Sequence, residues 1–261
     1  MQTFTSCMQC QVESYTPNFS SFGIKRIPDN GVIELTCDRG HRTFILMQTA
    51  KYEILSDLAV TAICDGYYRE EVASYASALE CLFEHYVNVV CRSHSINPDD
   101  IEAAWKPLRN SSERQFGAFA MLYLSETGKA FSTLDTKYIN FRNKVIHQRF
   151  IPGHKETLDY GQAVGNCAAP LIALLHSPRY EKAQQAFFSD SLREKAKQAI
   201  KVGARHSTQW MATPFGGKNI SAGFDLNAAL AERAMQPDID STVAESYAFA
   251  RLLALLSPSK S

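Results

Sequence analysis

The sequence lacks the marks of a secreted or membrane-spanning chain. No run of about 18 uncharged apolar residues occurs, which is roughly what a helix needs to cross a bilayer. The first five residues show no basic segment followed by an apolar one, so no secretory leader is expected. Low-complexity tracts and internal repeats are also missing. We therefore expect a globular, cytoplasmic protein with no membrane partner.

The sequence also lacks net charge. Its 27 basic and 27 acidic residues cancel, so no overall field attracts nucleic acid. Any nucleic-acid binding must use a local patch. The 261 residues are enough to bury a sizeable core, so stability does not require disulfide bonds.

The cysteines do not form the pattern of a disulfide framework. There are seven, an odd number. Three lie near the start and the others are scattered through apolar helical patterns; in order they are Cys7, Cys10, Cys37, Cys64, Cys81, Cys91 and Cys167. This distribution predicts metal ligands and buried thiols in a reducing compartment.

Two closely spaced ligand pairs predict a metal site near the N-terminus. Cys7 and Cys10 form one pair, and Cys37 and His41 form the other. Three thiolates and one imidazole complete the tetrahedral shell of Zn²⁺ and leave no position for water, so the predicted zinc is structural. The alternative is a set of free thiols in an unstructured arm.

Residues 1–46 combine these ligands with β-type runs, and the segment resembles a zinc ribbon. The runs 24–27 and 32–35 flank Asn30 and Gly31, which predicts a hairpin because a type I′ turn needs positive φ at both central residues. A third run, 42–47, would add a strand. So short a module buries little core, so metal binding would supply its folding free energy.

Beyond residue 46 the apolar residues recur three and four positions apart, which predicts a mainly α-helical protein. One helix should begin at Asn97-Pro98, since Asn caps a helix and Pro suits its first turn. The other expected helices cover about 47–63, 69–92, 112–131, 136–150, 154–176, 179–204, 227–235 and 241–256. We group them into a bundle, 47–178, and a C-terminal helical extension, 179–261.

The segment 141–152 carries the residues best suited to catalysis. Arg142 and Asn143 are followed by His147. On a helix Asn143 and His147 share a face, whereas Arg142 needs its long side chain to reach the same site. Imidazole titrates near neutral pH and can take or deliver a proton. Guanidinium keeps its charge and can stabilise a phosphorane-like transition state.

This Arg-Asn-x-x-x-His pattern, with the Pro-bounded turn and the segment 155–161 after it, resembles the signature of the HEPN family of helical ribonucleases. The resemblance covers about residues 47–178. It implies a metal-independent endoribonuclease that cleaves RNA by attack of the 2′-hydroxyl group, with Arg142, Asn143 and His147 as catalytic residues. It also implies a homodimer with the active site at the interface. Many members are toxins or antiviral-defence effectors, so a regulatory or inhibitor protein is an expected partner.

Further residues are candidates for substrate binding. Glu80 belongs to a helix that borders the site in the family, and Lys144 lies within the motif. Four basic residues recur every fourth position on an expected helix and would form a ridge that tracks phosphates; they are Arg193, Lys197, Lys201 and Arg205. The alternative for the ridge is a solvated helix face.

Two other functions remain open at this point. The motif residues are compatible with a surface cation and an ordinary helix histidine, in a non-catalytic module that binds a nucleotide, nucleic acid or protein. A regulator that binds duplex DNA through the ribbon is the third reading, and the neutral overall charge disfavours it.

Overall fold

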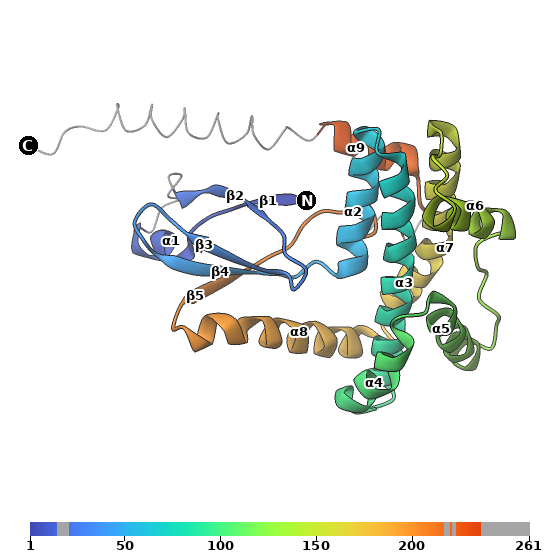
Figure 1. Ribbon diagram of the computed structural model, residues 1–261. Helices are drawn as coiled ribbons and strands as arrows, with labels where there is room; N and C mark the ends of the chain where they lie inside the picture. The colour runs from blue at the N-terminus through green and yellow to red at the C-terminus, as the bar shows by residue number, and fades with distance from the viewer. Residues whose placement is uncertain (15–20, 217–219, 221–222, 236–261) are drawn as a thin grey trace, which may run out of the picture. The chain divides into compact units, whose positions relative to one another are not determined.

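The computed structural model describes residues 1–14, 21–216, 220 and 223–235 (Figure 1). The protein is mainly α-helical with a small β region near its N-terminus, as predicted. No helix in the described part combines the length and the apolar character needed to cross a bilayer. The expected helix at 241–256 lies outside the described residues.

The chain forms two compact units, and both are discontinuous in sequence. One, here called the β unit, joins Met1–Gln48 with Asp190–Met211. The other, the helical unit, joins Thr49–Ser189 with Ala212–Ala234. This division differs from the three consecutive domains expected. The described part of 179–261 is no separate extension, because its segments pack into the two units.

The β unit contains two small sheets. The strands are β1 (Gln2–Thr5), β2 (Gly23–Arg26), β3 (Val32–Thr36), β4 (Arg42–Met47) and β5 (Arg205–Gln209). β1 pairs with β2 in an antiparallel sheet. In the second sheet β4 is central, antiparallel to β3 and parallel to β5. The strand expected at 42–47 is thus confirmed.

The hairpin expected at Asn30-Gly31 is wrong. The turn itself forms, since Gly31 has a φ of 65° and its N–H donates to the carbonyl of Pro28. The Asn30 side chain accepts from the N–H of Val32. The strands on either side of this turn then belong to different sheets, because β2 finds its partner in β1 and β3 finds its partner in β4.

Alternation along β3 and β4 gives the larger sheet two apolar faces. Ile33, Leu35, Ile45 and Met47 pack on one face with Cys7 and Cys10, next to α1 (Met8–Ser14). The opposite face packs on α8 (Glu181–Lys201); the contacts there involve Val32, Phe44, Leu46, Ala196 and Ala199. The β unit therefore has three layers, with the cysteine pair inside one of its two cores.

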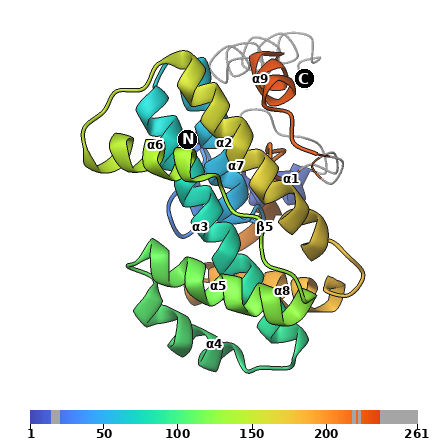
Figure 2. The ribbon, with the colours of Figure 1, turned by 90° about the vertical axis from the view of Figure 1, so that its right-hand side faces the viewer.

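The helical unit is built around one long central helix, α3 (Tyr68–Ser93). Its other elements are α2 (Lys51–Cys64), α4 (Pro98–Trp105), the short 3₁₀ helix η2 (Lys106–Leu108), α5 (Ser112–Thr127), α6 (Thr136–His147), α7 (His154–Leu175), the first part of α8, and α9 (Leu226–Met235). Figure 2 looks onto α5, α6 and α7, which lie against α3. The fully buried side chains of this core include Tyr75, Leu82, Tyr86 and Phe119.

Local signals account for the helix boundaries. Asn97 caps α4 as predicted, by accepting a hydrogen bond from the N–H of Asp99. α5 ends earlier than expected because Gly128 takes a left-handed φ of 70°. α6 ends at His147, and the N–H of Phe150 then bonds back to the carbonyl of Lys144.

Glycines on α7 admit the segment that leads into α9. A Cβ atom on Gly165 would lie 1.8 Å from the Phe224 ring, so the ring occupies space that only glycine leaves open. The Gln162 side chain holds the same segment, donating to the carbonyl of Phe224 and accepting from the N–H of Leu226. This packing explains why residues 212–234 belong to the helical unit.

Candidate functional site

The four predicted metal ligands come together. The ligand atoms of Cys7, Cys10, Cys37 and His41 all lie within 4.8 Å of one another. The Cys10 Sγ atom is 3.7 Å from Cys37 Sγ and 3.3 Å from His41 Nδ1. Donors around one tetrahedral ion, with sulfur at about 2.3 Å and nitrogen at about 2.0 Å, would be separated by roughly 3.5 to 3.8 Å. The cluster can therefore hold a metal ion.

Two elements supply the ligands. Cys7 and Cys10 lie at and within α1, and Cys37 and His41 flank the turn between β3 and β4. In that turn the N–H of Gly40 donates to the carbonyl of Cys37, and Gly40 takes a φ of 78°. The turn thus directs both side chains to the same point.

The thiols lie close enough to influence one another's ionisation. Burial, followed by hydrogen bonds that the Cys10 thiol donates to Cys37 and Cys7, raises the pKa of Cys10 to about 12. Burial also opposes ionisation of Cys37, but the backbone N–H groups of Arg39 and His41 outweigh it and lower the pKa of that thiol. A bound cation would offset the charge of several thiolates in so small a space.

The second ring nitrogen of His41 points to a carboxylate. Its Nε2 atom lies 3.7 Å from Glu13 Oε1, while Nδ1 faces the thiols. A metal-bound histidine usually directs its free N–H to such a group, which fixes the ring orientation. Glu13 was not among the predicted site residues. The signal available in the sequence is its place three residues after Cys10, on the same helix.

The Arg142 side chain is half-buried and held in place. Its Nη2 atom donates to Glu80 Oε1 on α3, and its Nη1 atom donates to Asn143 Oδ1, both at 3.0 Å. Burial raises the pKa of Glu80, although the adjacent guanidinium opposes this shift. The structure therefore brings three predicted residues together, with Glu80 as the group that orients Arg142.

His147 and Lys144 are both exposed on α6, and His147 is its last residue. Immediately after the helix, Arg149 has a φ of 62°, which is rare for a residue with a side chain. Backbone of this kind costs roughly 1–2 kcal/mol. His147 thus lies at the end of α6, next to a turn in which Arg149 adopts a left-handed backbone conformation.

Tyr160 of α7 packs behind the motif. Its ring contacts the rings of Tyr138 and Phe141 on α6, and its side chain is buried. Burial raises the pKa of this phenol, and the Arg142 charge opposes the shift. Tyr160 lies in the segment 155–161 that the resemblance covers, but sequence reasoning gave it no role.

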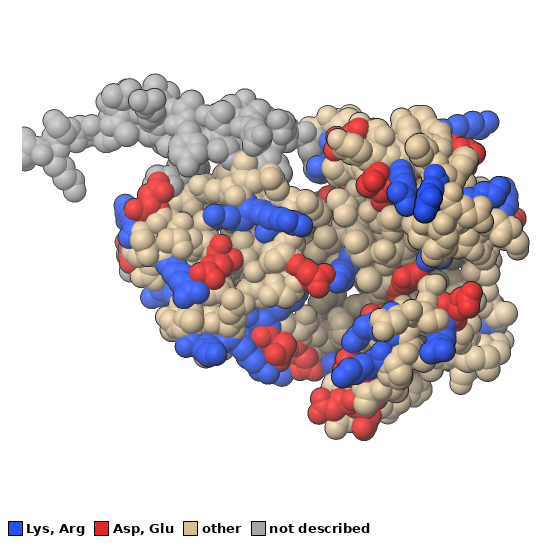
Figure 3. Space-filling view, in the orientation of Figure 1, with Lys and Arg blue, Asp and Glu red and all other residues tan. Residues whose placement is uncertain are grey.

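The four basic residues of the predicted ridge do not share one helix. Arg193 and Lys197 lie on α8 and pair with Asp190 and Glu194. Lys201 ends α8, and Arg205 begins β5, so the expected helix to 204 stops early. The helix cannot continue through Arg205 because residues 205–209 pair as a strand with β4. Figure 3 shows basic and acidic side chains interspersed over the visible face.

Comparisons of the chain with protein-family models, curated proteins and solved structures find no match.

Proposed function

We propose that the protein is a metal-independent endoribonuclease whose site is centred on Arg142 and His147. The observation that carries this proposal is that hydrogen bonds to Glu80 and Asn143 hold the Arg142 side chain in place. Arg142 lies on the same helix, α6, as the exposed His147. A guanidinium oriented in advance loses little freedom when it binds a phosphate. The exposed imidazole remains open to substrate.

The proposed reaction needs only these side chains. The imidazole of His147 takes the proton from a ribose 2′-hydroxyl group, and the 2′-oxygen attacks the adjacent phosphorus. The bond from phosphorus to the 5′-oxygen breaks, and that oxygen leaves with a proton supplied by an imidazolium. The products carry a 2′,3′-cyclic phosphate and a free 5′-hydroxyl group. Arg142 stabilises the extra negative charge of the transition state.

A homodimer is part of the proposal, because one imidazole cannot act as base and acid in the same step. Three apolar side chains near the motif are exposed: Ile139, Phe150 and Ile151 are 41%, 38% and 82% exposed. A second copy that covers these side chains would bring its own Arg142 and His147 to the same phosphate. Burial of this patch would favour association.

For the metal cluster we propose structural zinc. Cys7, Cys10, Cys37 and His41 offer three sulfurs and one nitrogen, the donor set that zinc takes in closed sites. A closed shell has no position for water or substrate. The role is therefore stability of the β unit, and the reaction at Arg142 proceeds without it.

The test is cleavage of total RNA by the full-length protein in a chelator, with the product ends identified. Wild type should give cyclic phosphate ends, and His147→Ala and Arg142→Ala should each lose about 10²-fold or more of the rate. His206→Ala is the matched control, because this histidine is exposed on β5 and outside the motif. It should cleave like wild type.

Two outcomes would contradict the ribonuclease. Equal cleavage by wild type and His147→Ala would exclude His147 as the catalyst. Absence of cleavage by a dimeric, folded wild type would favour the non-catalytic binding module. A role in toxicity or antiviral defence is tested separately, by the growth of cells that express wild type or His147→Ala.

A further inference from the structure

Two thiols of the metal-binding cluster are also placed to react with each other. Cys10 and Cys37 are 27 residues apart in the sequence, yet their Sγ atoms are 3.7 Å apart. A disulfide bond has an S–S length of about 2.05 Å, so the two sulfurs need to approach by roughly 1.7 Å. Small rotations of two side chains supply such a movement. The cluster can therefore be closed by a covalent bond as well as by a metal ion.

The two thiols differ in their access to solvent. Cys10 lies in α1 and is fully buried, as is Cys7. Cys37 follows β3, at the turn before β4, and is partly exposed. A small oxidant in the solvent therefore reaches Cys37 first. An accessible sulfur with a second sulfur beside it is the arrangement found in oxidation-sensitive cysteine pairs.

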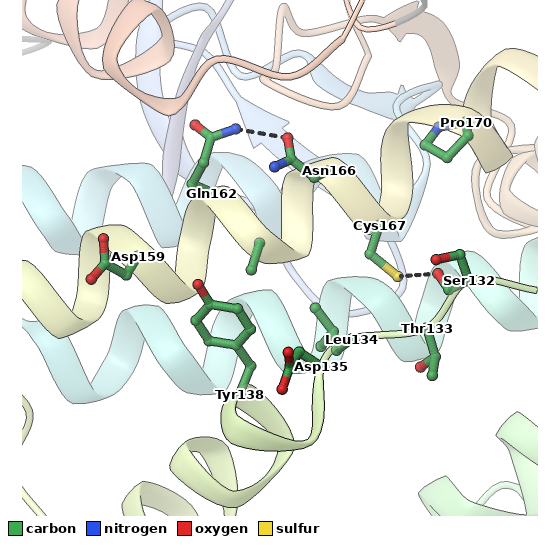
Figure 4. A pocket seen from close by; sticks show the side chains of 11 residues that line it. Ser132, Thr133, Leu134, Asp135, Tyr138, Asp159, Gln162, Asn166, Cys167 and Pro170 are labelled. Atoms are coloured by element: carbon green, nitrogen blue, oxygen red, sulfur yellow. Dashed lines mark hydrogen bonds between the residues drawn. The ribbon is translucent and has the colours of Figure 1, made fainter.

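Cysteines of the helical unit do not combine these two properties. Cys64 is exposed, but no other sulfur lies within hydrogen-bonding distance of it in the described part of the chain. Cys167 of α7 is buried, and its thiol donates to the carbonyl of Ser132 (Figure 4). These two thiols therefore serve as references for the pair in the β unit.

We propose that Cys37 and Cys10 form a peroxide-reactive pair that closes to a disulfide bond. The Cys37 thiolate attacks one oxygen of hydrogen peroxide. A sulfur–oxygen bond forms, the oxygen–oxygen bond breaks, and the hydroxide that leaves takes up a proton and becomes water. Cys37 is thereby oxidised to a sulfenic acid, and the peroxide is reduced.

Cys10 completes the reaction. Its sulfur attacks the Cys37 sulfur, the sulfur–oxygen bond breaks, and hydroxide leaves as water with the proton of the Cys10 thiol. The two thiols supply both electrons, so one molecule of peroxide gives one disulfide bond and two molecules of water. The oxidant is the single co-reactant that the reaction needs.

The new bond joins the same elements as a bound metal ion would. Cys10 belongs to α1, and Cys37 to the turn between β3 and β4 (Figure 1). Closing the chain between these residues restricts the unfolded state and so stabilises the folded one. The oxidised β unit therefore stays folded in the presence of a chelator, whereas the reduced unit depends on its ion.

Oxidation also releases the ion, because it removes two of the four donors. Cys7 and His41 alone leave half of the tetrahedral shell unfilled. This release rests on the structural zinc proposed above. Formation of the disulfide does not rest on it, because the reaction involves only the two cysteines and the peroxide.

The test is treatment of the full-length protein with hydrogen peroxide, followed by alkylation, digestion and mass spectrometry. The peptides that contain Cys10 and Cys37 should be joined, with the loss of two hydrogen atoms, and dithiothreitol should separate them. A chelating dye should detect one zinc ion for each disulfide. Protein that carries no zinc should form the same bond, so this proposal and the zinc proposal fail independently.

Hydrogen exchange measures the effect on the fold. In a chelator, the amides of β3 and β4 should be protected about 10²-fold or more in the oxidised protein relative to the reduced one, as expected for a closed loop of this length. Cys37→Ser should gain no protection from peroxide. Cys64→Ser is the matched control, because this exposed thiol lies in the helical unit, and it should behave like wild type.

Three results would overturn the proposal. One is a wild type in which Cys10 and Cys37 both remain open to alkylation, after denaturation, once peroxide has acted. Another is a disulfide that joins a different pair, such as Cys7 and Cys10. The third is an oxidised protein in which β3 and β4 exchange as fast in the chelator as they do in the reduced protein.

Discussion

Replacement of Glu71 by glutamine should stabilise the protein, and increasingly so as pH rises. Glu71 lies on α3 with its side chain fully buried, and neither carboxylate oxygen has a hydrogen-bond partner in the described part of the chain. A Cβ atom on Gly161 would come within 2.9 Å of one of these oxygens. Burial alone raises the pKa of Glu71 to about 9, from an ordinary value of 4.5.

The sign follows from proton binding. Above pH 4.5 the unfolded chain ionises Glu71, whereas the folded chain keeps it protonated up to about pH 9. Folding therefore takes up a proton, so stability from this group is complete in acid and is lost as pH rises. The loss is about 1.4 kcal/mol per pH unit, or roughly 3 kcal/mol between pH 4.5 and 7. Glutamine has the same shape and does not ionise.

Urea unfolding at pH 5.5, 7 and 8 tests this reasoning. The stability of Glu71→Gln relative to wild type should increase by about 3 kcal/mol from pH 5.5 to 8. The buried amide donors of the glutamine do not ionise and affect stability equally at each pH, so the change with pH is the decisive quantity. Glu70→Gln, at an exposed position on the same helix, is the control. Parallel pH profiles for wild type and Glu71→Gln would refute the argument.

Three further substitutions test the fold. Gly165→Ala should destabilise the helical unit by about 1–3 kcal/mol in urea unfolding, because the new methyl group overlaps the Phe224 ring; an unchanged midpoint would contradict that packing. Cys10→Ser should lose the metal and unfold the β unit, measured by metal analysis and by circular dichroism in chelator; wild-type metal content would contradict the site. Glu126→Gln should cost about 1.5–3 kcal/mol at pH 7, because the buried carboxylate accepts from His94 and Tyr180. Burial acts to raise the pKa of Glu126, but these hydrogen bonds outweigh it and lower that pKa. The stability difference between wild type and Glu126→Gln should therefore vanish as pH falls through the lowered pKa. A stability difference that stays constant with pH would contradict this account.

Local signals were sufficient for part of this structure. The spacing of Cys7, Cys10, Cys37 and His41 predicted a cluster that the structure confirms as a possible metal site. The Asn97 cap predicted the start of α4. These features depend on residues near in sequence or on chemistry that few side chains offer, so they can be recognised without knowledge of the tertiary fold.

Long-range pairing could not be predicted in the same way. Arg205–Gln209 is polar and shows no apolar alternation, yet it forms a strand because β4 offers an edge from the far end of the sequence. The hairpin predicted at Asn30-Gly31 is wrong for a related reason: β2 pairs with β1 and β3 pairs with β4, so β2 and β3 do not pair with each other.

The parallel pairing of β4 with β5 also constrains the order of folding during synthesis. Thr43 leaves the ribosome long before Arg205, its partner across the sheet. At about 5–20 residues per second, the β3–β4 pair waits several seconds or more for α8 and β5 to appear. All four metal ligands, by contrast, lie within the first 41 residues. An ion captured at that stage would keep the emerging strands in register until the rest of their sheet arrives.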